Sequence, residues 1–161
     1  VDRVHLITLS DRASQGAYED LSTPVLRAWL QEQGLARITA ILLPDEPAAL
    51  EGELRRAVQE DADLILTCGG TGFGPRDLTP EATRRVLERE APGVTEFIRA
   101  RGGHPMAYVS RALCGTAGRT VILNLSGRPQ GALEQLQLAW PLLKHAVATL
   151  RKRPEPSSSC T

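Results

Sequence analysis

Residues 67–83 read TCGGTGFGPRDLTPEAT and follow directly on the apolar run 64–66. The apolar run is typical of a buried strand, and the four glycines that follow remove the Cβ atoms that would keep a ligand away from the backbone. Successive N–H groups can then line up on an anion such as a phosphate. Thr79 is suited to cap a helix, Pro80 to occupy its first position and Glu81 to lie at the positive end of its dipole. The stretch predicts a strand, a phosphate-binding loop and a helix.

The loop belongs to neither of two common phosphate-binding motifs. It lacks the lysine followed by Ser or Thr that a Walker loop requires, and its glycine spacing is not that of a Rossmann fingerprint. The alternative is a tight connection whose glycines only relieve a steric conflict. The addition of Arg76 and Asp77 to four glycines favours ligand binding.

Strand-like and helix-like segments alternate outward from this loop. Strands are predicted over 4–9, 37–43, 63–67 and 120–125, and helices over 23–33, 47–60, 80–90, 93–101 and 131–151. The glycine-rich stretch 102–119 is expected to be a loop with one short strand or turn. The alternation predicts an α/β fold with three layers, a mainly parallel sheet with helices on both faces. We expect a single domain over 1–151 and a flexible C-terminal tail over 152–161.

Polar groups follow each predicted strand, and the carboxyl ends of parallel strands meet at one edge of a sheet. Four turns should therefore converge: Ser10-Asp11-Arg12, Asp45-Glu46, the glycine loop with Arg76 and Asp77, and Ser126-Gly127-Arg128. Backbone amides, arginines and isolated carboxylates suit phosphoryl or nucleotidyl transfer, in which positioning and charge neutralisation supply most of the catalysis. Asp45 and Asp77 are the candidate Mg²⁺ ligands, because Mg²⁺ often uses only one or two protein carboxylates.

The bulk composition excludes several classes of partner. Nineteen basic residues balance nineteen acidic ones, so no global field favours nucleic acid or an anionic membrane, and neither is predicted as a partner. No apolar run approaches the roughly 20 residues of a membrane span, and the chain starts on a strand-like segment rather than a signal sequence. A cytoplasmic protein is therefore expected. The spacing of Cys68, Cys114 and Cys160 predicts neither a zinc site nor a disulfide framework, and Cys68 is expected to pack as a small apolar residue.

At residues 69–83 the sequence resembles the signature of the molybdopterin-binding proteins of molybdenum cofactor biosynthesis, the MogA/MoaB family. The resemblance extends from Leu6 to about Leu150. Five further segments of this chain resemble short motifs of the family. They are SDRAS (10–14) followed by Gly16, Tyr18 and Asp20, LPDE (43–46), EAPG (90–93), VSR (109–111) and ILNL (122–125). The early SDRAS word is more similar to the MogA-type adenylyltransferase than to the MoaB-type relatives.

The resemblance implies molybdopterin adenylyltransferase activity. Molybdopterin and Mg-ATP would give adenylyl-molybdopterin and pyrophosphate, by attack of the terminal phosphate of molybdopterin on the α-phosphate of ATP. By motif match, Asp45 and Asp77 inherit the catalytic and metal-binding roles. The remaining residues implied to bind the pterin and the nucleotide are Ser10, Asp11, Thr67, Gly69, Gly70, Thr71, Gly72, Arg76, Ser126, Gly127 and Arg128. The resemblance also implies a homotrimer and handover of the product to a molybdenum-inserting protein.

One segment departs from the sequence pattern of the family, and two alternative functions stay open. After the last strand the family usually has Pro-Gly-Asn-Pro, whereas this chain has Ser126-Gly127-Arg128-Pro129. Arg128 either contacts phosphate or points into water. A non-catalytic molybdopterin-binding or scaffolding member is the first alternative function, and a nucleotide-binding module without chemistry is the second.

Overall fold

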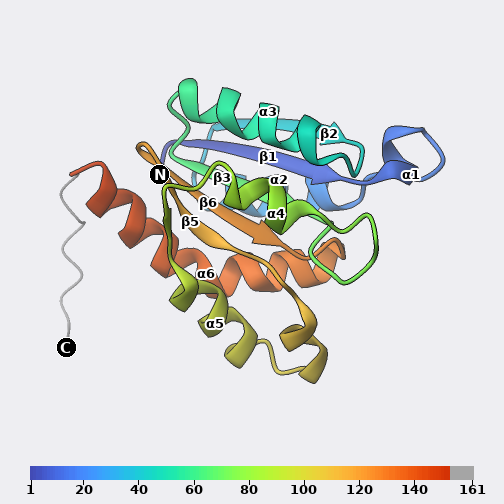
Figure 1. Ribbon diagram of the computed structural model, residues 1–161. Coiled ribbons are helices and arrows are strands. Elements are labelled where there is room, and N and C mark those ends of the chain that lie inside the picture. The colour runs from blue at the N-terminus through green and yellow to red at the C-terminus, as the bar shows by residue number, and fades with distance from the viewer. Residues whose placement is uncertain (153–161) are drawn as a thin grey trace.

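The computed structural model describes residues 1–152, and these form a six-stranded sheet with helices on both faces (Figure 1). The elements are β1 (Arg3–Leu9), α1 (Asp11–Ser14), α2 (Ser22–Glu32), β2 (Arg37–Leu43), α3 (Pro47–Gln59), β3 (Leu64–Cys68), α4 (Thr79–Arg84), β4 (Arg89–Glu90), α5 (Pro92–Arg101), the 3₁₀ helix η1 (Pro105–Val109), β5 (Cys114–Ala117), β6 (Thr120–Leu125) and α6 (Pro129–Leu150). The predicted three-layer α/β fold is confirmed. The tail predicted over 152–161 lies, apart from Lys152, outside the described residues.

The strand order is β2-β1-β3-β6-β5-β4, and the first four of these strands are mutually parallel. In this register Leu6 of β1 pairs with Ala40 of β2 on one side and with Leu66 of β3 on the other. β5 runs antiparallel to β6, and β4 antiparallel to β5. The sheet is therefore mainly parallel, with an antiparallel extension at one edge.

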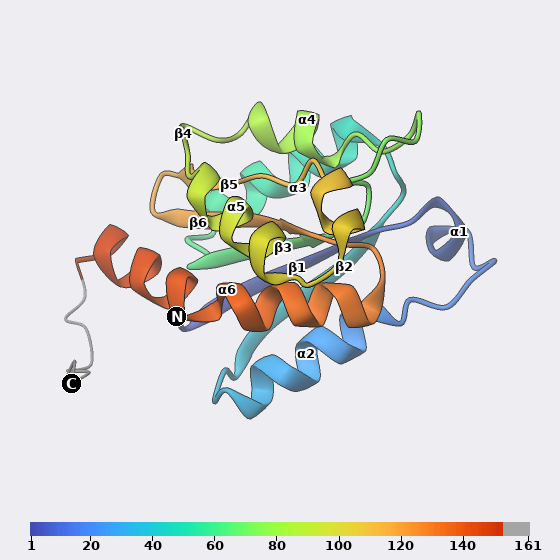
Figure 2. The same ribbon diagram turned by 90° about the horizontal axis from the view of Figure 1, so that it is seen from below.

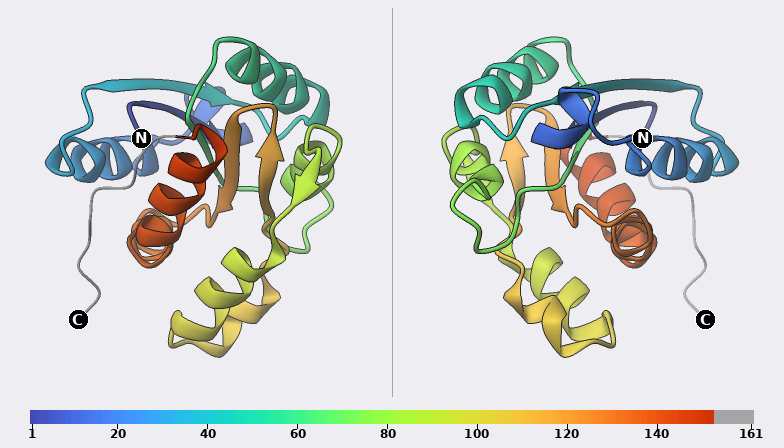
Figure 3. Two further views of the ribbon diagram at one scale, coloured as in Figure 1. Left: turned by 90° about the vertical axis from the view of Figure 1, so that its left-hand side faces the viewer. Right: turned by 90° about the vertical axis from the view of Figure 1, so that its right-hand side faces the viewer.

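Two hydrophobic cores lie on opposite faces of this sheet because successive side chains of a strand point to opposite sides. Leu64 and Leu66 of β3 join the core under α2, α5 and α6, while Ile65 between them joins the core under α3 and α4. Figures 2 and 3 show α2 and α6 packed along one face and α3 on the other. Trp29 and Trp140 meet edge to face between α2 and α6, with ring centroids 5.4 Å apart.

Most of the predicted boundaries agree with the structure to within two residues, but the helix predicted over 80–90 is wrong. It ends at Arg84, and residues 89–90 form the edge strand β4. The N–H groups of Glu88 and Ala91 donate to the carbonyls of Thr116 and Cys114, at 2.8 and 2.7 Å. Pairing with β5 thus overrides the local helical preference, and Pro92 disfavours helical geometry in the residue before it.

Three smaller predictions near the loops also need correction or refinement. Residues 11–14, expected as loop, form α1, because Ser10 Oγ accepts a hydrogen bond from Ala13 N at 3.1 Å and caps the turn. Thr79 is not the cap of α4; it is the first helical residue, and Leu78 occupies the cap position without a side-chain bond. The stretch 102–119 contains the predicted short strand, β5, and in addition η1. Within the described residues no helix is both long and apolar enough to cross a bilayer.

Candidate active site

The turns that follow β1, β2, β3 and β6 meet at one end of the sheet, on the right in Figure 1 beside α1. This convergence follows from the parallel register, which places the carboxyl ends of these four strands at one edge. Backbone bonds tie the turns together: Ser10 N donates to Leu43 O at 3.0 Å and Gly69 N to Leu125 O at 3.2 Å. We call this assembly of turns the rim.

Two carboxylates of the rim hold each other's backbone. Asp11 N donates to Asp45 Oδ2 and Asp45 N donates to Asp11 Oδ1, each at 2.9 Å. This reciprocal exchange fixes the turn after β1 against the turn after β2. It also holds two negative charges close together, an arrangement that is unfavourable without a nearby cation.

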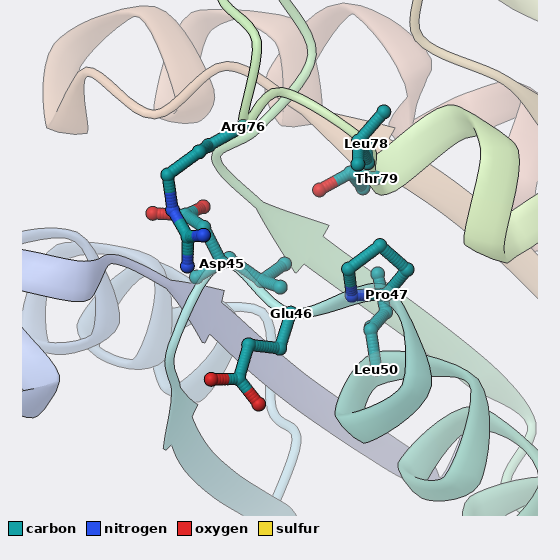
Figure 4. Close-up of a pocket in the computed structure, with 8 residues that line it drawn as sticks. Asp45, Glu46, Pro47, Leu50, Arg76, Leu78 and Thr79 are labelled. Carbon is teal, nitrogen blue, oxygen red and sulfur yellow. The ribbon is translucent and has the colours of Figure 1, made fainter.

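Arg76 supplies one such cation by reaching from the glycine loop to Asp11. Its Nε and NH2 groups both donate to the Asp11 carboxylate, the NH2 bond being 2.9 Å long. The hydrogen bond from Arg76 lowers the pKa of Asp11 below its ordinary value, although burial opposes the shift. Figure 4 shows Arg76 extended toward Asp45, with the carboxylate of Glu46 turned away from the pair. Arg76 therefore ties the glycine loop to the turn after β1, a role that the sequence did not predict for it.

The pKa of Asp45 is shifted in the opposite direction to that of Asp11. Burial raises its pKa, and the charges of Asp11 and Asp77 add to the rise. Asp45, Arg76 and Thr79 line the same shallow depression in the surface. A carboxylate that is partly desolvated and surrounded by like charges favours the approach of a cation. Asp45 and Asp77 therefore fit the Mg²⁺ that accompanies a nucleotide, although residues 1–152 contain no cluster of three or more His, Cys, Asp or Glu side chains that could hold a metal alone.

The glycine loop turns sharply beside these carboxylates. Gly69 and Gly70 both have positive φ angles, of 109° and 66°. A Cβ atom on Gly69 would lie 2.5 Å from Leu9 O, and one on Gly70 would lie 2.3 Å from Thr79 Oγ1. Only glycine fits these two positions without rearrangement. The glycines are thus required by the close packing of the loop against Leu9 and Thr79.

The loop also presents four consecutive backbone amides that could bind a ligand. Within the described residues, the N–H groups of Gly70, Thr71, Gly72 and Phe73 donate no hydrogen bond to the protein. The next amide, Gly74 N, donates to Asp77 Oδ2 at 2.8 Å and so fixes the carboxylate beside the run. Gly70 and Gly72 are half-buried and Phe73 is exposed, so these amides are accessible and free to bind an acceptor-rich ligand.

The turn after β6 closes the rim on its other side. A Cβ on Gly127 would lie 3.2 Å from Gly69 Cα, so the two loops are in contact. Ser126 N donates to Gln135 Oε1 at 2.7 Å, and Ser126 Oγ accepts from Arg128 N at 3.3 Å. Arg128 is the cap residue of α6 and is exposed. The structure therefore brings all four predicted turns together.

Thr67 lies apart from the other predicted site residues. It is fully buried below the loop, and its hydroxyl accepts a hydrogen bond from Asn124 Nδ2 at 2.8 Å. Asn124 Nδ2 also donates to Thr83 Oγ1 at 2.9 Å, which joins β6 to β3 and α4. Cys68 packs as predicted: it is buried, its Sγ lies 2.8 Å from Ser126 O, and burial raises the pKa of its thiol to about 12. A thiol in this state is not a nucleophile at neutral pH.

Arg111 is the functional candidate that the sequence analysis passed over. Its guanidinium donates to Gly72 O at 2.7 Å, to Asp77 O and to the carboxylate of Glu81, while its backbone N–H donates to Thr71 O at 2.9 Å. It lies far from the glycine loop in the chain, and the only signal for it in the sequence was the VSR motif (109–111) that resembles the family.

Comparisons with known proteins agree with this geometry. A family model described as "Probable molybdopterin binding domain" matches residues 5–145. The chain is 41% identical over 141 residues to the molybdopterin adenylyltransferase of Haemophilus influenzae, covering 84% of this chain and 71% of that protein. It is also 41% identical over 146 residues to the molybdenum cofactor synthesis protein cinnamon of Drosophila melanogaster, covering 88% of this chain but only 24% of that protein.

The structural likeness extends over nearly the whole chain. The crystal structure of the molybdopterin biosynthesis enzyme MoaB from Thermus thermophilus superimposes with a TM-score of 0.89 at 43% identity, covering 96% of this chain and 99% of that one. The Mog protein from Mycobacterium ulcerans gives a TM-score of 0.87 at 35% identity, with coverage of 93% and 99%. Fold and sequence agree, and the chain belongs to the family of molybdopterin-binding domains of molybdenum cofactor biosynthesis.

Proposed function

We propose that this protein is a molybdopterin adenylyltransferase, which transfers the adenylyl group of Mg-ATP to molybdopterin. The observation that carries the proposal is the run of four unpaired amides from Gly70 to Phe73 beside the carboxylates of Asp45 and Asp77. The names of the Haemophilus relative and of other relatives at about 40% identity support the same activity.

The reaction needs little acid–base chemistry from the protein. A terminal phosphate oxygen of molybdopterin attacks the α-phosphorus of ATP, the bond from that phosphorus to the oxygen bridging to the β-phosphate breaks, and pyrophosphate leaves. A phosphate monoester has a second pKa of about 6 and is mostly dianionic at neutral pH, so no strong general base is required. The task of the site is to bring two anionic reactants together and to neutralise charge.

The described residues supply these effects in different ways. The amides of residues 70–73 bind phosphate oxygens, with Gly69 and Gly70 allowing the turn. Ser10, Asp11 and the turn of Ser126, Gly127 and Arg128 border the remaining space for the pterin and the nucleotide. Thr67 supports the loop from below through Asn124.

Asp45 and Asp77 would hold the magnesium ion of Mg-ATP, which neutralises charge on the phosphates. The raised pKa of Asp45 supports this role, because a bound cation would offset the repulsion from Asp11 and Asp77. As further parts of the same proposal, the protein acts in the cytoplasm, and the family resemblance adds that it is a homotrimer and passes its product to a molybdenum-inserting protein.

Incubation with molybdopterin, ATP and magnesium tests the proposal, with pyrophosphate release as the readout. We expect release that depends on all three components. Tight binding of molybdopterin without any release would instead identify a binding or scaffolding member. Tight binding of ATP without affinity for molybdopterin would identify a nucleotide-binding module. Calorimetry with each ligand alone separates these outcomes.

A further inference from the structure

We propose that Arg111 is a positioning residue that orients the phosphate-binding amides of the glycine loop without touching the substrate. The inference rests on the proposed function only in that the loop binds the phosphates of a nucleotide. Sequence reasoning favoured Arg76 as the arginine of this loop, but Arg76 is committed to Asp11 on the other side of the rim.

Arg111 holds the loop from behind at both ends of its turn. Its Nε donates to Gly72 O at 2.7 Å and its NH2 to Asp77 O, so one guanidinium spans the segment between these two carbonyls. NH1 pairs with Glu81 in the first turn of α4, and the guanidinium also lies 5.7 Å from the ring centroid of Phe73. A planar guanidinium with fixed donor directions can bridge several acceptors in one geometry, which an ammonium group cannot do.

The direction of these bonds decides where the loop's N–H groups point. In a trans peptide the C=O and N–H bonds point in opposite directions, and the described chain contains no cis peptide. Arg111 N–H holds the carbonyl of the peptide between Thr71 and Gly72, and Arg111 Nε holds that of the peptide between Gly72 and Phe73. The amides of Gly72 and Phe73 therefore face away from Arg111, and both belong to the unpaired run.

The same bonds add an electrostatic effect. A positive charge at the carbonyl side of a peptide polarises it and strengthens its N–H as a donor on the opposite side. Of the two peptides, only the one between Gly72 and Phe73 has its carbonyl at the guanidinium, because the carbonyl of Thr71 is held by the backbone N–H of Arg111. Arg111 thus acts on a bound phosphate through the N–H of Phe73 rather than by direct contact. Its bond to Asp77 O fixes the backbone of the residue whose carboxylate lies beside those amides.

The chain offers a matched control in Arg99. Arg99 also donates to two backbone carbonyls, of Ser110 at 3.0 Å and of Ala112 at 2.9 Å, and neither of these bonds is to the glycine loop. Arg99→Met and Arg111→Met therefore both loosen the segment around residue 111, but only the second removes the guanidinium bonds to Gly72 O and Asp77 O. Arg111→Lys keeps the charge and loses the bridging geometry.

The experiment measures binding of Mg-ATP by calorimetry and follows the amide signals of Gly72 and Phe73 by NMR during the titration. For Arg111→Met we expect about a tenfold or greater loss of affinity for Mg-ATP, and loss of the shift of the Phe73 amide seen in the unchanged protein, since the Gly72 amide is oriented by the backbone N–H of residue 111. Arg111→Lys should remain impaired, whereas Arg99→Met should bind Mg-ATP normally. Thermal unfolding identifies the change in stability that each variant carries.

Three results would overturn the inference. The first is wild-type affinity for Mg-ATP in Arg111→Met, and the second is an equal loss in Arg99→Met, which would indicate a merely structural role. The third is full recovery in Arg111→Lys, which would show that charge alone matters. Because the readout is nucleotide binding, failure of pterin-dependent pyrophosphate release in the unchanged protein would refute the proposed reaction and leave this test intact.

Discussion

The two ends of the parallel sheet satisfy their polar groups in opposite ways. At the amino end, the buried guanidinium of Arg151 bonds to the carboxylates of Asp61 and Asp63 and to the carbonyl of Ala62, at 2.7 to 3.1 Å. At the carboxyl end, Asp11, Asp45 and Asp77 lie near one another, and four successive amides have no partner within residues 1–152. The amino ends of the strands are therefore stabilised by satisfied ion pairs and hydrogen bonds, whereas, within the described residues, their carboxyl ends carry unsatisfied polar groups. Proteins commonly give up stability in this way where a functional site is placed.

Asp77→Asn is the strongest test of the view that the carboxyl end of the sheet serves function rather than stability. We expect about a thousandfold loss of pterin-dependent pyrophosphate release, because the change removes a charge from the reaction site. The amide side chain can still accept the bond from Gly74 N, so molybdopterin binding and the melting temperature should stay close to those of the unchanged protein. Undiminished turnover would remove Asp77 from the reaction.

The reverse pattern is expected for Arg151→Met at the amino end. Asp63 is only 1% exposed, and removal of the guanidinium would leave its buried charge with the neutral N–H groups of Asp2 and Arg3 as donors, at a cost of about 3 kcal/mol in the free energy of unfolding. Denaturant titration measures that loss, while turnover per folded molecule should not change. A fall in turnover of the folded fraction would show that the two ends are coupled.

Gly70→Ala should damage both stability and activity, because the new methyl group would lie 2.3 Å from Thr79 Oγ1 in a strained backbone conformation. We expect a loss of about 2 kcal/mol in unfolding free energy together with weaker binding of Mg-ATP. Gly34→Ala is the matched control, since Gly34 also has a positive φ but has open space at the Cβ position, and it should cost about 1 kcal/mol. Equal losses in the two variants would mean that the close approach to Thr79 has no cost.

Asp45→Asn should give a small change in stability, in the favourable direction. Because the folded state raises the pKa of Asp45, the folded protein binds a proton more readily than the unfolded chain, and ionisation of this group costs stability as the pH rises above about 4. We expect the variant to melt about 1–2 °C higher at pH 7, with no gain at pH 3, and to lose adenylyl transfer. Glu46→Gln, the neighbouring carboxylate that is turned away, serves as the control. A lower melting temperature at pH 7 would show that the charge of Asp45 stabilises the fold.

Much of this arrangement could be predicted because it follows from local patterns. Alternating apolar segments gave the parallel strands, and the rule that their carboxyl ends share an edge brought Asp11, Asp45 and the glycine loop together. The helix predicted past Arg84 failed because pairing of β4 with β5 depends on residues distant in the chain.

The partners of the arginines could not be predicted for a similar reason. Which carboxylate or carbonyl a long side chain reaches depends on backbone separations that no sequence spacing gives. Arg76 was assigned to phosphate and binds Asp11, whereas Arg111, distant in sequence, supports the loop. The family resemblance implied that Thr67 binds the ligand, and the pleat of β3 turns its side chain toward Asn124.

The alternation of β3 between the two hydrophobic cores has a consequence for how the protein denatures. Leu64 and Leu66 belong to one core and Ile65 to the other, so neither helical layer can detach without exposing side chains of this shared central strand. We therefore expect one cooperative melting transition, in which cavity-forming substitutions beneath α3 and beneath α6 lower the same midpoint. Since the glycine loop begins where β3 ends, heat should abolish nucleotide binding at the temperature at which both layers melt.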